Sequence, residues 1–338
     1  MFEAMTSPPK RGPTIKDVAN AAGVSTATVS KYMSGNQRFS PEVEKRVAKA
    51  VQDLGWSSNP MARAMMTGRT GNVGIVVADI RSPSFNRLLD GATRGAVAAG
   101  FNFFVTDVMQ SGDIDLEMIK ALARRVDGLI VSSRLPTLIA TTLFECNTPL
   151  VFYGGPSRYS DYHSVSCDNF EAGRILGEHL RERGYRSISY LGFPLSPANA
   201  ERWRGLRSSY EGTQAAFSSY SLKALVPEEG ERLAQIVLES DNLPDAVIAF
   251  NDLVALGFLA KSRELGFDVP ERLALAAFDN TVYGRLQNPS LTSVDMASEE
   301  IGEVSMQCLS EIISGNKYSS DTILDAKLMV RKSTMKDA

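Results

Sequence analysis

Carboxylate and amide side chains stand directly after three apolar segments that the sequence predicts as β-strands. They are Asp79, Asn251, Asp252, Asp279 and Asn280. Ligands of parallel sheets bind at the carboxyl ends of the strands, where such groups can form hydrogen bonds with hydroxyl groups. The same residue types also cap the helices that follow strands. We expect this second role for Asp252 and Asn280.

The sequence shows no set of residues typical of an enzyme or a metal site. It contains no G-x-S-x-G, Walker A or H-E-x-x-H motif. Its cysteines lack metal-ligand spacing, so we expect reduced thiols at Cys146, Cys167 and Cys308. We expect the two histidines, His163 and His179, to lie at the surface. No catalytic residue, metal or cofactor is therefore expected.

A second polar set lies on a short helix that we expect over residues 26–33. The outer face of this helix carries Thr26, Ala27, Ser30 and Lys31. Small and hydroxylic side chains let a helix come close to base edges and phosphates, and a lysine can contact a guanine or a phosphate. A solvated face of an ordinary helical bundle has the same composition, so spacing alone leaves both interpretations open.

Three short helices are predicted near the N-terminus from capping residues and apolar stripes. They are expected to follow Thr14 (in a capping box with Asp17), Ser25, and Ser40 with Pro41 at the first helical position. Gly23 permits the turn between the first two helices, which gives a helix-turn-helix outline. The apolar faces, in which we include Met33 and Leu54, are expected to close a small core.

The rest of the chain alternates apolar strand-like segments with helical stretches. Strands are predicted at 73–78, 101–106, 128–132, 150–153, 187–191, 246–250 and 273–278. This alternation predicts an α/β body of two doubly wound parallel-sheet sub-domains, with helices on both faces of each sheet.

The distribution of charge also divides the chain into an N-terminal head and a body. Residues 1–70 carry ten Lys or Arg and five Asp or Glu, a net +5, which leaves −8 for the body against a total of −3.

Many segments of the chain resemble the LacI/GalR family of transcription regulators. In the head they are residues 14–19, 22–25, 28–31, 40–42 and 54–56; in the body they are residues 73–77, 125–130, 166–169, 251–257, 291–294 and 328–334. The resemblance extends from about Thr14 to Thr334. It implies an all-α helix-turn-helix head followed by a body like that of periplasmic binding proteins.

The residue patterns and the resemblance together predict four parts. They are a flexible arm at 1–13, a DNA-binding domain at 14–58, a hinge helix and linker at 59–71, and an effector-binding and dimerisation domain at 72–338. Within the last part, we expect sub-domain boundaries near 165 and 295 and a third crossover near 320.

The resemblance assigns the reading of the DNA major groove to Thr26, Ala27 and Lys31. It also places Met65 where the family has a leucine that wedges into the central base step. The whole expected DNA-binding set is Thr14, Ser25, Thr26, Ala27, Thr28, Ser30, Lys31, Asn59, Ala62 and Met65. The hinge helix, about nine residues long, is too short to be stable alone. A linker helix packed on the body is the alternative.

The resemblance also implies that Arg202, Asn251 and Asp279 bind a small-molecule effector. We add Asp79 as a strand-end carboxylate and Phe85 as an apolar wall of the same cleft. Two departures from sugar-binding members are visible: glycines stand at 154 and 155 instead of an acidic residue, and residues 225–229 lack an aromatic side chain for stacking. A sugar, a sugar acid or another polar metabolite is therefore open, with Arg202 as a carboxylate clamp.

These expectations describe a cytoplasmic, homodimeric repressor on a pseudo-palindromic operator, controlled by a small polar effector. We expect the cytoplasm because the N-terminus lacks an apolar signal core and no apolar run could span a bilayer. A solute-binding protein is the first alternative, and the basic head argues against it. A sugar-modifying enzyme is the second, and the missing catalytic motifs argue against that.

Overall fold

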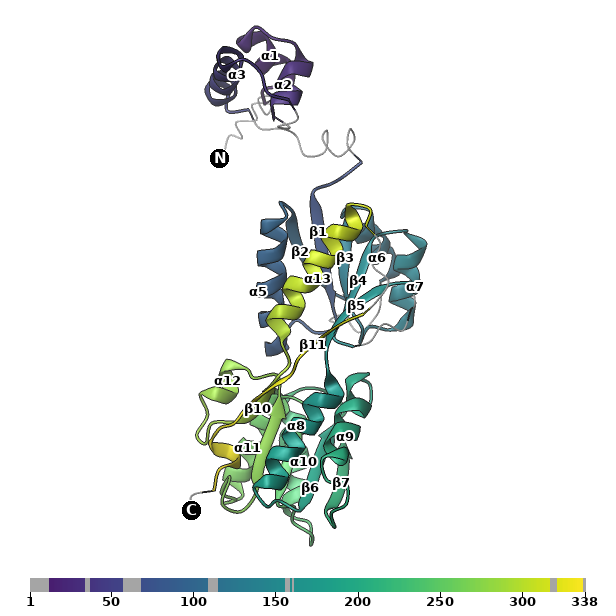
Figure 1. The fold of residues 1–338 in the computed structure, drawn as a ribbon, viewed down its shortest axis with the longest axis vertical. Coiled ribbons are helices and arrows are strands. Elements are labelled where there is room, and N and C mark those ends of the chain that lie inside the picture. Colours follow the sequence, from purple (N-terminus) through teal and green to yellow (C-terminus); the bar gives the residue numbers. More distant parts are fainter. Residues whose placement is uncertain are drawn as a thin grey trace, which may run out of the picture. The chain divides into compact units, whose positions relative to one another are not determined.

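The fold of the chain is taken from a computed structural model (Figure 1). The structure describes residues 12–33, 37–56, 68–108, 115–155, 159, 161–316 and 321–336. The chain divides into two compact units, Met1–Thr70 and Gly71–Ala338. Three expected DNA-binding residues, Asn59, Ala62 and Met65, lie outside the described residues.

The first unit, the head, contains the three predicted helices, whose presence is confirmed. They are α1 (Ile15–Ala22), α2 (Thr26–Met33) and α3 (Pro41–Leu54). The predicted capping box is present, because Thr14 N donates to Asp17 Oδ2 at 2.7 Å and Asp17 N donates to Thr14 Oγ1 at 3.4 Å. Ser25 Oγ accepts from Thr28 N at 3.0 Å and so caps α2 as predicted. Local sequence thus defines where these helices begin.

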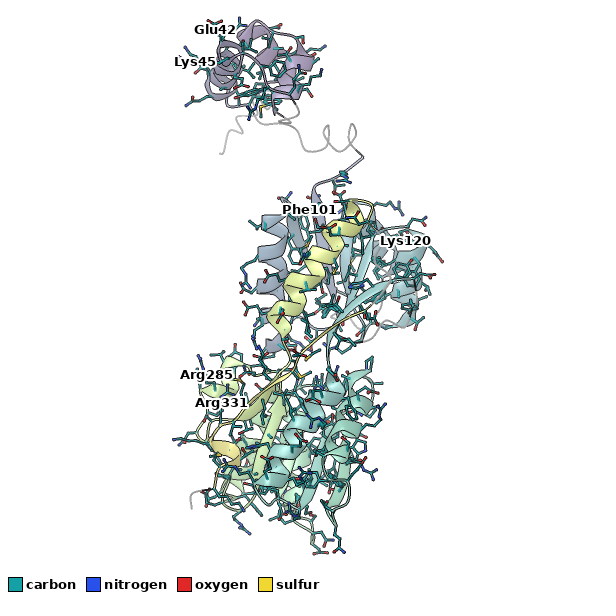
Figure 2. All side chains as sticks on the ribbon, in the orientation of Figure 1. Glu42, Lys45, Phe101, Lys120, Arg285 and Arg331 are labelled. Carbon is teal, nitrogen blue, oxygen red and sulfur yellow. The ribbon has the colours of Figure 1, made fainter. Side chains whose placement is uncertain are left out.

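Three details of the head differ from the prediction. The Ser40 side chain makes no capping hydrogen bond; the Glu44 carboxylate instead reaches back to accept from Phe39 N at 3.2 Å. Met33 and Leu54, expected in the core, are each 37% exposed. Both are the last residues of their helices, and the neighbouring Tyr32 and Trp56 pack against the core instead. The buried core consists of Val18, Ala19, Ala22, Val29, Val47 and Ala50. Glu42 and Lys45 lie on the exposed side of α3 (Figure 2).

The second unit, the body, contains two six-stranded sheets. The first has the order β11-β5-β4-β3-β1-β2 and the second the order β12-β10-β9-β8-β6-β7. The strands of the first are β1 (Asn72–Val77), β2 (Asn102–Asp107), β3 (Gly128–Ser132), β4 (Leu150–Tyr153), β5 (His163–Cys167) and β11 (Thr322–Leu324). Those of the second are β6 (Ser187–Gly192), β7 (Ala216–Ser221), β8 (Ala246–Ala249), β9 (Ala274–Phe278), β10 (Thr292–Asp295) and β12 (Lys327–Met329).

The predicted fold class is confirmed, because every strand pair is parallel except β10 with β12. Each sheet also repeats one strand order, β2-β1-β3-β4-β5 and β7-β6-β8-β9-β10. The order reverses between β1 and β3 in the first sheet and between β6 and β8 in the second. Ligands of doubly wound sheets bind beside such reversals, at the carboxyl ends of the strands. All seven predicted strands exist, and the five that the prediction omits are β5, β7, β10, β11 and β12.

Helices cover the two sheets and pack in pairs. The first sheet carries α5 (Pro83–Ala98), α6 (Leu116–Ala123), α7 (Thr137–Glu145) and α13 (Ser298–Ile313). The second carries α8 (Asn169–Glu182), α9 (Ala198–Ser208), α10 (Pro227–Leu238), α11 (Asp252–Glu264) and the short α12 (Val282–Arg285), with a final 3₁₀ turn at Lys332–Thr334. Glycine allows close helix contacts, since a Cβ on Gly91 of α5 would lie 1.9 Å from the Glu299 carbonyl oxygen of α13.

The chain passes between the two sub-domains three times. It leaves the first sheet after β5, returns to it through α13 after β10, and crosses again between β11 and β12 (Figure 1). Polar residues are therefore buried where the crossing segments pack. His163 and His179 are 3% and 9% exposed, not at the surface as expected. Their Nε2 atoms lie 3.1 Å from Thr322 Oγ1 and 2.8 Å from Thr334 Oγ1, because buried polar groups need partners.

The three cysteines are free thiols, as predicted. Within the described ranges, no helix is both long enough and apolar enough to cross a membrane.

Candidate functional site

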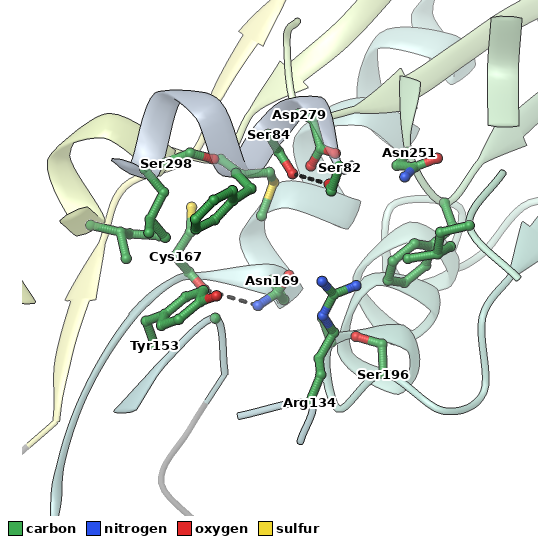
Figure 3. A pocket seen from close by; sticks show the side chains of 18 of the residues that line it. Ser82, Ser84, Arg134, Tyr153, Cys167, Asn169, Ser196, Asn251, Asp279 and Ser298 are labelled. Atoms are coloured by element: carbon green, nitrogen blue, oxygen red, sulfur yellow. Dashed lines mark hydrogen bonds between the residues drawn. The ribbon is translucent and has the colours of Figure 1, made fainter. Parts of the chain in front are cut away.

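All five residues predicted to bind an effector line one cavity of the body. They are Asp79, Phe85, Arg202, Asn251 and Asp279. The cavity has a volume of about 120 Å³ and lies at the carboxyl ends of strands from both sheets (Figure 3). The structure therefore brings these residues together from distant parts of the sequence, and their role in binding stays a prediction.

The guanidinium of Arg202 on α9 is built into the cavity wall. Its Nε donates to Asn169 Oδ1 at 2.9 Å, and its Nη1 donates to the Phe250 carbonyl at 2.8 Å. The group also lies between two aromatic rings, 4.6 Å from the centroid of Phe250 and 4.4 Å from that of Phe278. Burial lowers the pKa of Arg202. Two of its five N–H donors are thus used by the protein, and the rest remain for a ligand.

Asp279 follows β9 in a backbone conformation that is rare for a residue with a side chain. Its φ is 108°, and that of Asn280 is 50°. The strained turn is held by Asp279 N, which donates to the Val294 carbonyl at 2.9 Å, and by Asn280 N, which donates to Ser293 Oγ at 2.9 Å. Burial raises the pKa of Asp279 to about 7, against the opposing effect of the Arg202 charge. Backbone strain of this kind is typical of functional sites.

The two expected helix caps at the strand ends are wrong by one residue. Asn251, not Asp252, caps α11, because Asn251 Oδ1 accepts from Val254 N at 2.9 Å. Thr281, not Asn280, caps α12 through its hydroxyl, which accepts from Gly284 N at 3.4 Å. Asn251 therefore has a structural role, and its amide nitrogen is the part directed to the cavity (Figure 3).

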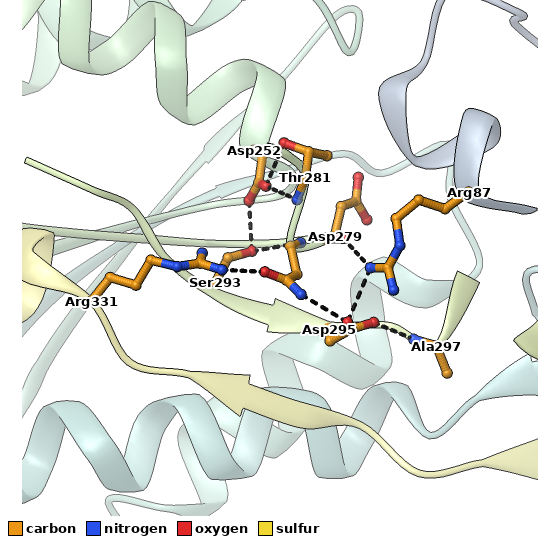
Figure 4. A network of polar contacts seen from close by, with 9 residues as sticks. Arg87, Asp252, Asp279, Thr281, Ser293, Asp295, Ala297 and Arg331 are labelled. Atoms are coloured by element: carbon orange, nitrogen blue, oxygen red, sulfur yellow. Dashed lines mark hydrogen bonds and ion pairs between the residues drawn. The ribbon is translucent and has the colours of Figure 1, made fainter. Parts of the chain in front are cut away.

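Asp252 is fully buried and organises the turn after β9 (Figure 4). Its carboxylate accepts from Thr281 N at 2.6 Å, from Thr281 Oγ1 at 2.8 Å and from Ser293 Oγ at 2.6 Å. Burial raises its pKa, and these hydrogen bonds oppose that rise. As the first residue of α11, Asp252 is turned toward the neighbouring strand, which explains why it does not cap the helix.

Asp79 is already engaged within the protein. Arg81 forms a two-pronged ion pair with it, at 2.9 Å from Nε to Oδ1 and 3.0 Å from Nη2 to Oδ2. This hydrogen bonding lowers the pKa of Asp79. Phe85 lies in the first turn of α5, is 6% exposed and supplies the expected apolar wall.

The cavity also contains polar residues that sequence reasoning missed. They are Ser82, Ser84, Arg134, Tyr153, Asn169, Ser196 and Ser298. Arg134 and Tyr153 stand at the ends of β3 and β4, two strands that were predicted exactly. The strand-end signal is thus present in the sequence for an arginine and a tyrosine as well as for carboxylates and amides.

The predicted DNA-binding residues of the head that the structure describes occupy one side of α2 and the N-caps of α1 and α2. Thr26, Ala27 and Lys31 are exposed, while Thr28 and Ser30 are half-buried. The fully buried Val29 points the other way. Thr14 and Ser25 lie outside this face and cap their helices, as described above. The structure thus gathers the central residues on one helix face, and their contact with DNA stays a prediction.

Comparison with known proteins identifies both units. The family model for bacterial regulatory proteins of the lacI family matches residues 14–59, and the model for a periplasmic binding protein-like domain matches residues 178–334. The HTH-type transcriptional repressor PurR of Mannheimia succiniciproducens is 28% identical over 332 residues, covering 96% of this chain and 99% of the relative. The NTD biosynthesis operon regulator NtdR of Bacillus subtilis is 27% identical, covering 95% and 100%.

Solved structures agree with this result. A complex of the transcriptional regulator CelR with cellobiose has a TM-score of 0.70 and 27% identity, covering 95% of this chain and 99% of that chain. The lac repressor dimer bound to operator and an anti-inducer has a TM-score of 0.85 over 96% and 100%; at 22% identity it supports the fold. The chain belongs to the lacI family of bacterial regulatory proteins.

Proposed function

We propose that the chain is a transcriptional repressor that binds an operator as a homodimer and responds to a small polar metabolite in the body. One observation carries this proposal. A lacI-family helix-turn-helix head is joined to a body whose cavity collects all five residues predicted to bind an effector.

The head supports DNA binding through its charge and its exposed helix face. Residues 1–70 carry a net +5, as counted above. Thr26, Ala27 and Lys31 are all exposed on α2, so this face can enter the major groove without moving the core. Lysine makes a point contact with phosphate or guanine, which gives looser base selection than an arginine fork.

The cavity supports control by a ligand because both sub-domains contribute to its wall. Asp79 and Phe85 come from the first, while Arg202, Asn251 and Asp279 come from the second. A ligand that touches both sides stabilises one relative arrangement of the sub-domains over others. Such a preference is what couples an effector site to a distant DNA-binding site. Among similar structures, the CelR complex holds cellobiose, a hydroxyl-rich ligand.

Nucleophilic catalysis in this cavity finds little support. Cys167 lines it, but burial raises the pKa of the Cys167 thiol to about 12. A thiol is reactive only as the thiolate, so this cysteine is inert near neutral pH. We therefore propose a binding function for the cavity.

Salt-dependent DNA binding tests the proposal against a solute-binding protein. The full chain is titrated with generic double-stranded DNA, followed by fluorescence anisotropy at several salt concentrations. A repressor with about 6–10 phosphate contacts loses roughly 10³–10⁵-fold in affinity between about 50 and 200 mM salt. No measurable DNA binding at low salt would contradict the proposed function and favour a solute-binding protein.

A further inference from the structure

Arg134 is a cation of the cavity that the protein leaves without a counter-charge in contact. It stands two residues after β3, and its guanidinium projects into the cavity (Figure 3). Its backbone N–H donates to Ser132 Oγ at 3.4 Å. Within the part of the chain that the structure describes, its guanidinium forms no ion pair and no hydrogen bond with the protein. An arginine in this position has all five donors available for a ligand.

The backbone around Arg134 is fixed on both sides. Ser133 N donates to the Tyr153 carbonyl at 2.9 Å, and Leu135 N donates to the Ser132 carbonyl at 3.2 Å. Leu135 is 6% exposed and anchors the turn in the core between the first sheet and its helices. Arg134 therefore projects from a rigid support, which is how precise binding groups are held.

The other charged groups of the cavity interact with groups of opposite charge. Asp79 is paired with Arg81. Arg202 and Asp279 interact electrostatically, since the charge of Arg202 lowers the pKa of Asp279 against the larger effect of burial. The charge of Arg134 also favours the ionised forms of Asp79 and Asp279, but among the described residues none forms an ion pair with its guanidinium.

The two glycines that follow β4, close to the Arg134 turn, carry no side chain that could offset the positive charge of Arg134. Gly154 lines the cavity with a φ of +85°, and a Cβ on Gly155 would lie 2.9 Å from Ser133 Oγ. A side chain at either position meets strain or a close contact. No carboxylate of the chain is thus placed beside Arg134 from this turn.

We propose that the effector is a polyhydroxy carboxylic acid whose carboxylate pairs with Arg134. This inference rests on the proposed function of the body as an effector-binding domain. An arginine without an ion-pair partner among the described residues matches a carboxylate, which guanidinium can bind with two parallel hydrogen bonds. Four serine hydroxyls suit the hydroxyl groups of such an acid; they belong to Ser82, Ser84, Ser196 and Ser298. Phe85, Leu225 and Met296 provide apolar surface for its carbon chain.

Matched sets of neutral and acidic sugars test this inference on the full chain. The probes are D-glucose, D-gluconate, D-glucuronate and D-glucose 6-phosphate, with the corresponding four D-galactose compounds. Thermal shift ranks the eight probes, and calorimetric titration gives Kd for the best of them. We expect a carboxylate to stabilise the chain most. We expect Arg134→Gln to weaken its binding by about tenfold or more, because a hydrogen bond to a charged group is lost.

The control variant is Lys120→Gln, which removes one positive charge from the surface of the same sub-domain, where Lys120 pairs with Glu117 at 3.0 Å (Figure 2). It should bind the acid as the unmodified chain does, and Arg134→Lys should retain part of the affinity. The inference is overturned if no carboxylate binds, if a neutral sugar or sugar phosphate binds best, or if Arg134→Gln leaves Kd unchanged. DNA binding of the unmodified chain is measured separately, so failure of the proposed function is recognised independently.

Discussion

Arg87 of the first sub-domain donates a hydrogen bond to Asp295 of the second, at 3.0 Å between Nη1 and Oδ2 (Figure 4). The same nitrogen also lies 3.4 Å from the carbonyl oxygen of Asp279. Asp295 accepts in addition from Asn280 Nδ2 at 2.8 Å, and Asn280 Oδ1 accepts from Arg331 at 2.5 Å. A polar network thus joins α5 to the strained turn that carries a cavity carboxylate.

Arg87→Met should loosen this connection between the sub-domains. The substitution keeps an apolar stem but leaves the half-buried Asp295 without its ion-pair partner, and such losses are destabilising. We expect a lower thermal midpoint and faster amide hydrogen exchange over residues 279–297. Arg94→Met is the matched control on α5, because Arg94 pairs with Asp90 and Glu299 at the exposed surface. Equal effects of both substitutions would show that the contact has no special role.

Arg202→Ala should damage the body as well as the effector response. The change leaves Asn169 Oδ1 and the Phe250 carbonyl without donors, and it empties the space between two aromatic rings. We expect the unfolding free energy to fall by about 2–4 kcal/mol. Arg204→Ala, on the exposed side of α9, should have little effect. Scanning calorimetry of both variants measures the difference. If Arg202→Ala unfolds at the same temperature as Arg204→Ala, the structural role of Arg202 is contradicted.

The raised pKa of Asp279 predicts a pH dependence with a defined sign. A carboxyl group with a higher pKa in the folded than in the unfolded chain binds more protons when folded. Its contribution to the unfolding free energy therefore falls as the pH rises from about 4 to about 7. Asp279→Asn lacks this loss, so the variant should gain stability relative to the unmodified chain between pH 5 and pH 8. Denaturant titrations at both pH values measure the difference.

Asp79→Asn provides the contrasting control for this experiment. Arg81 lowers the pKa of Asp79, so the Asp79 carboxylate adds stability above its unfolded pKa and loses it as the pH falls through the folded value. The Asp79 variant should therefore show no gain between pH 5 and pH 8. A flat difference for Asp279→Asn would mean that Asp279 is ionised throughout this range.

Strands that are buried on both faces were predictable, and edge strands were not. β3 and β4 are uninterrupted apolar runs, so their limits agree with the sequence prediction residue for residue. β7 reads Ala-Phe-Ser-Ser-Tyr-Ser and is largely exposed at the edge of its sheet, so it carries no apolar signal. Short strands such as β11 form only because the crossing segment finds a free edge there, which local sequence does not encode.

The site residues were predictable where a polar residue directly follows a strand. They were less predictable where two neighbouring residues stand at a helix start and only one of them caps the helix. Asn251 and Asp252 are neighbours, yet one caps α11 and the other is buried in the turn after β9. Which of the two residues caps the helix depends on the direction in which α11 starts. Tertiary packing sets this direction, and local sequence does not encode it. Arg134 and Asn169 reach the same cavity only because the carboxyl ends of the strands of both sheets meet there, so their proximity could not be predicted from spacing.

Gly91→Ala should separate two helices that frame the cavity. The new Cβ would lie 1.9 Å from the Glu299 carbonyl oxygen, so α5 and α13 must move apart. Overpacking of this kind typically costs about 1–3 kcal/mol. Val97→Ala on the same helix is the control, because Val97 is 70% exposed. Chemical denaturation should show a lower midpoint for the glycine variant alone; unchanged stability would contradict the close contact of the two helices.

Lys31→Ala should weaken DNA binding through one lost phosphate or base contact. Lys31 is exposed on α2 beside Thr26 and Ala27, so its removal should lower affinity for generic DNA and reduce the salt slope by about 1. Lys45→Ala removes the same charge from the exposed side of α3 and is the matched control. Anisotropy titrations at several salt concentrations compare the two. If both variants lose the same affinity, the net charge of the head governs binding and the α2 face has no special part in it. A larger loss for Lys31→Ala would assign the DNA contact to that face.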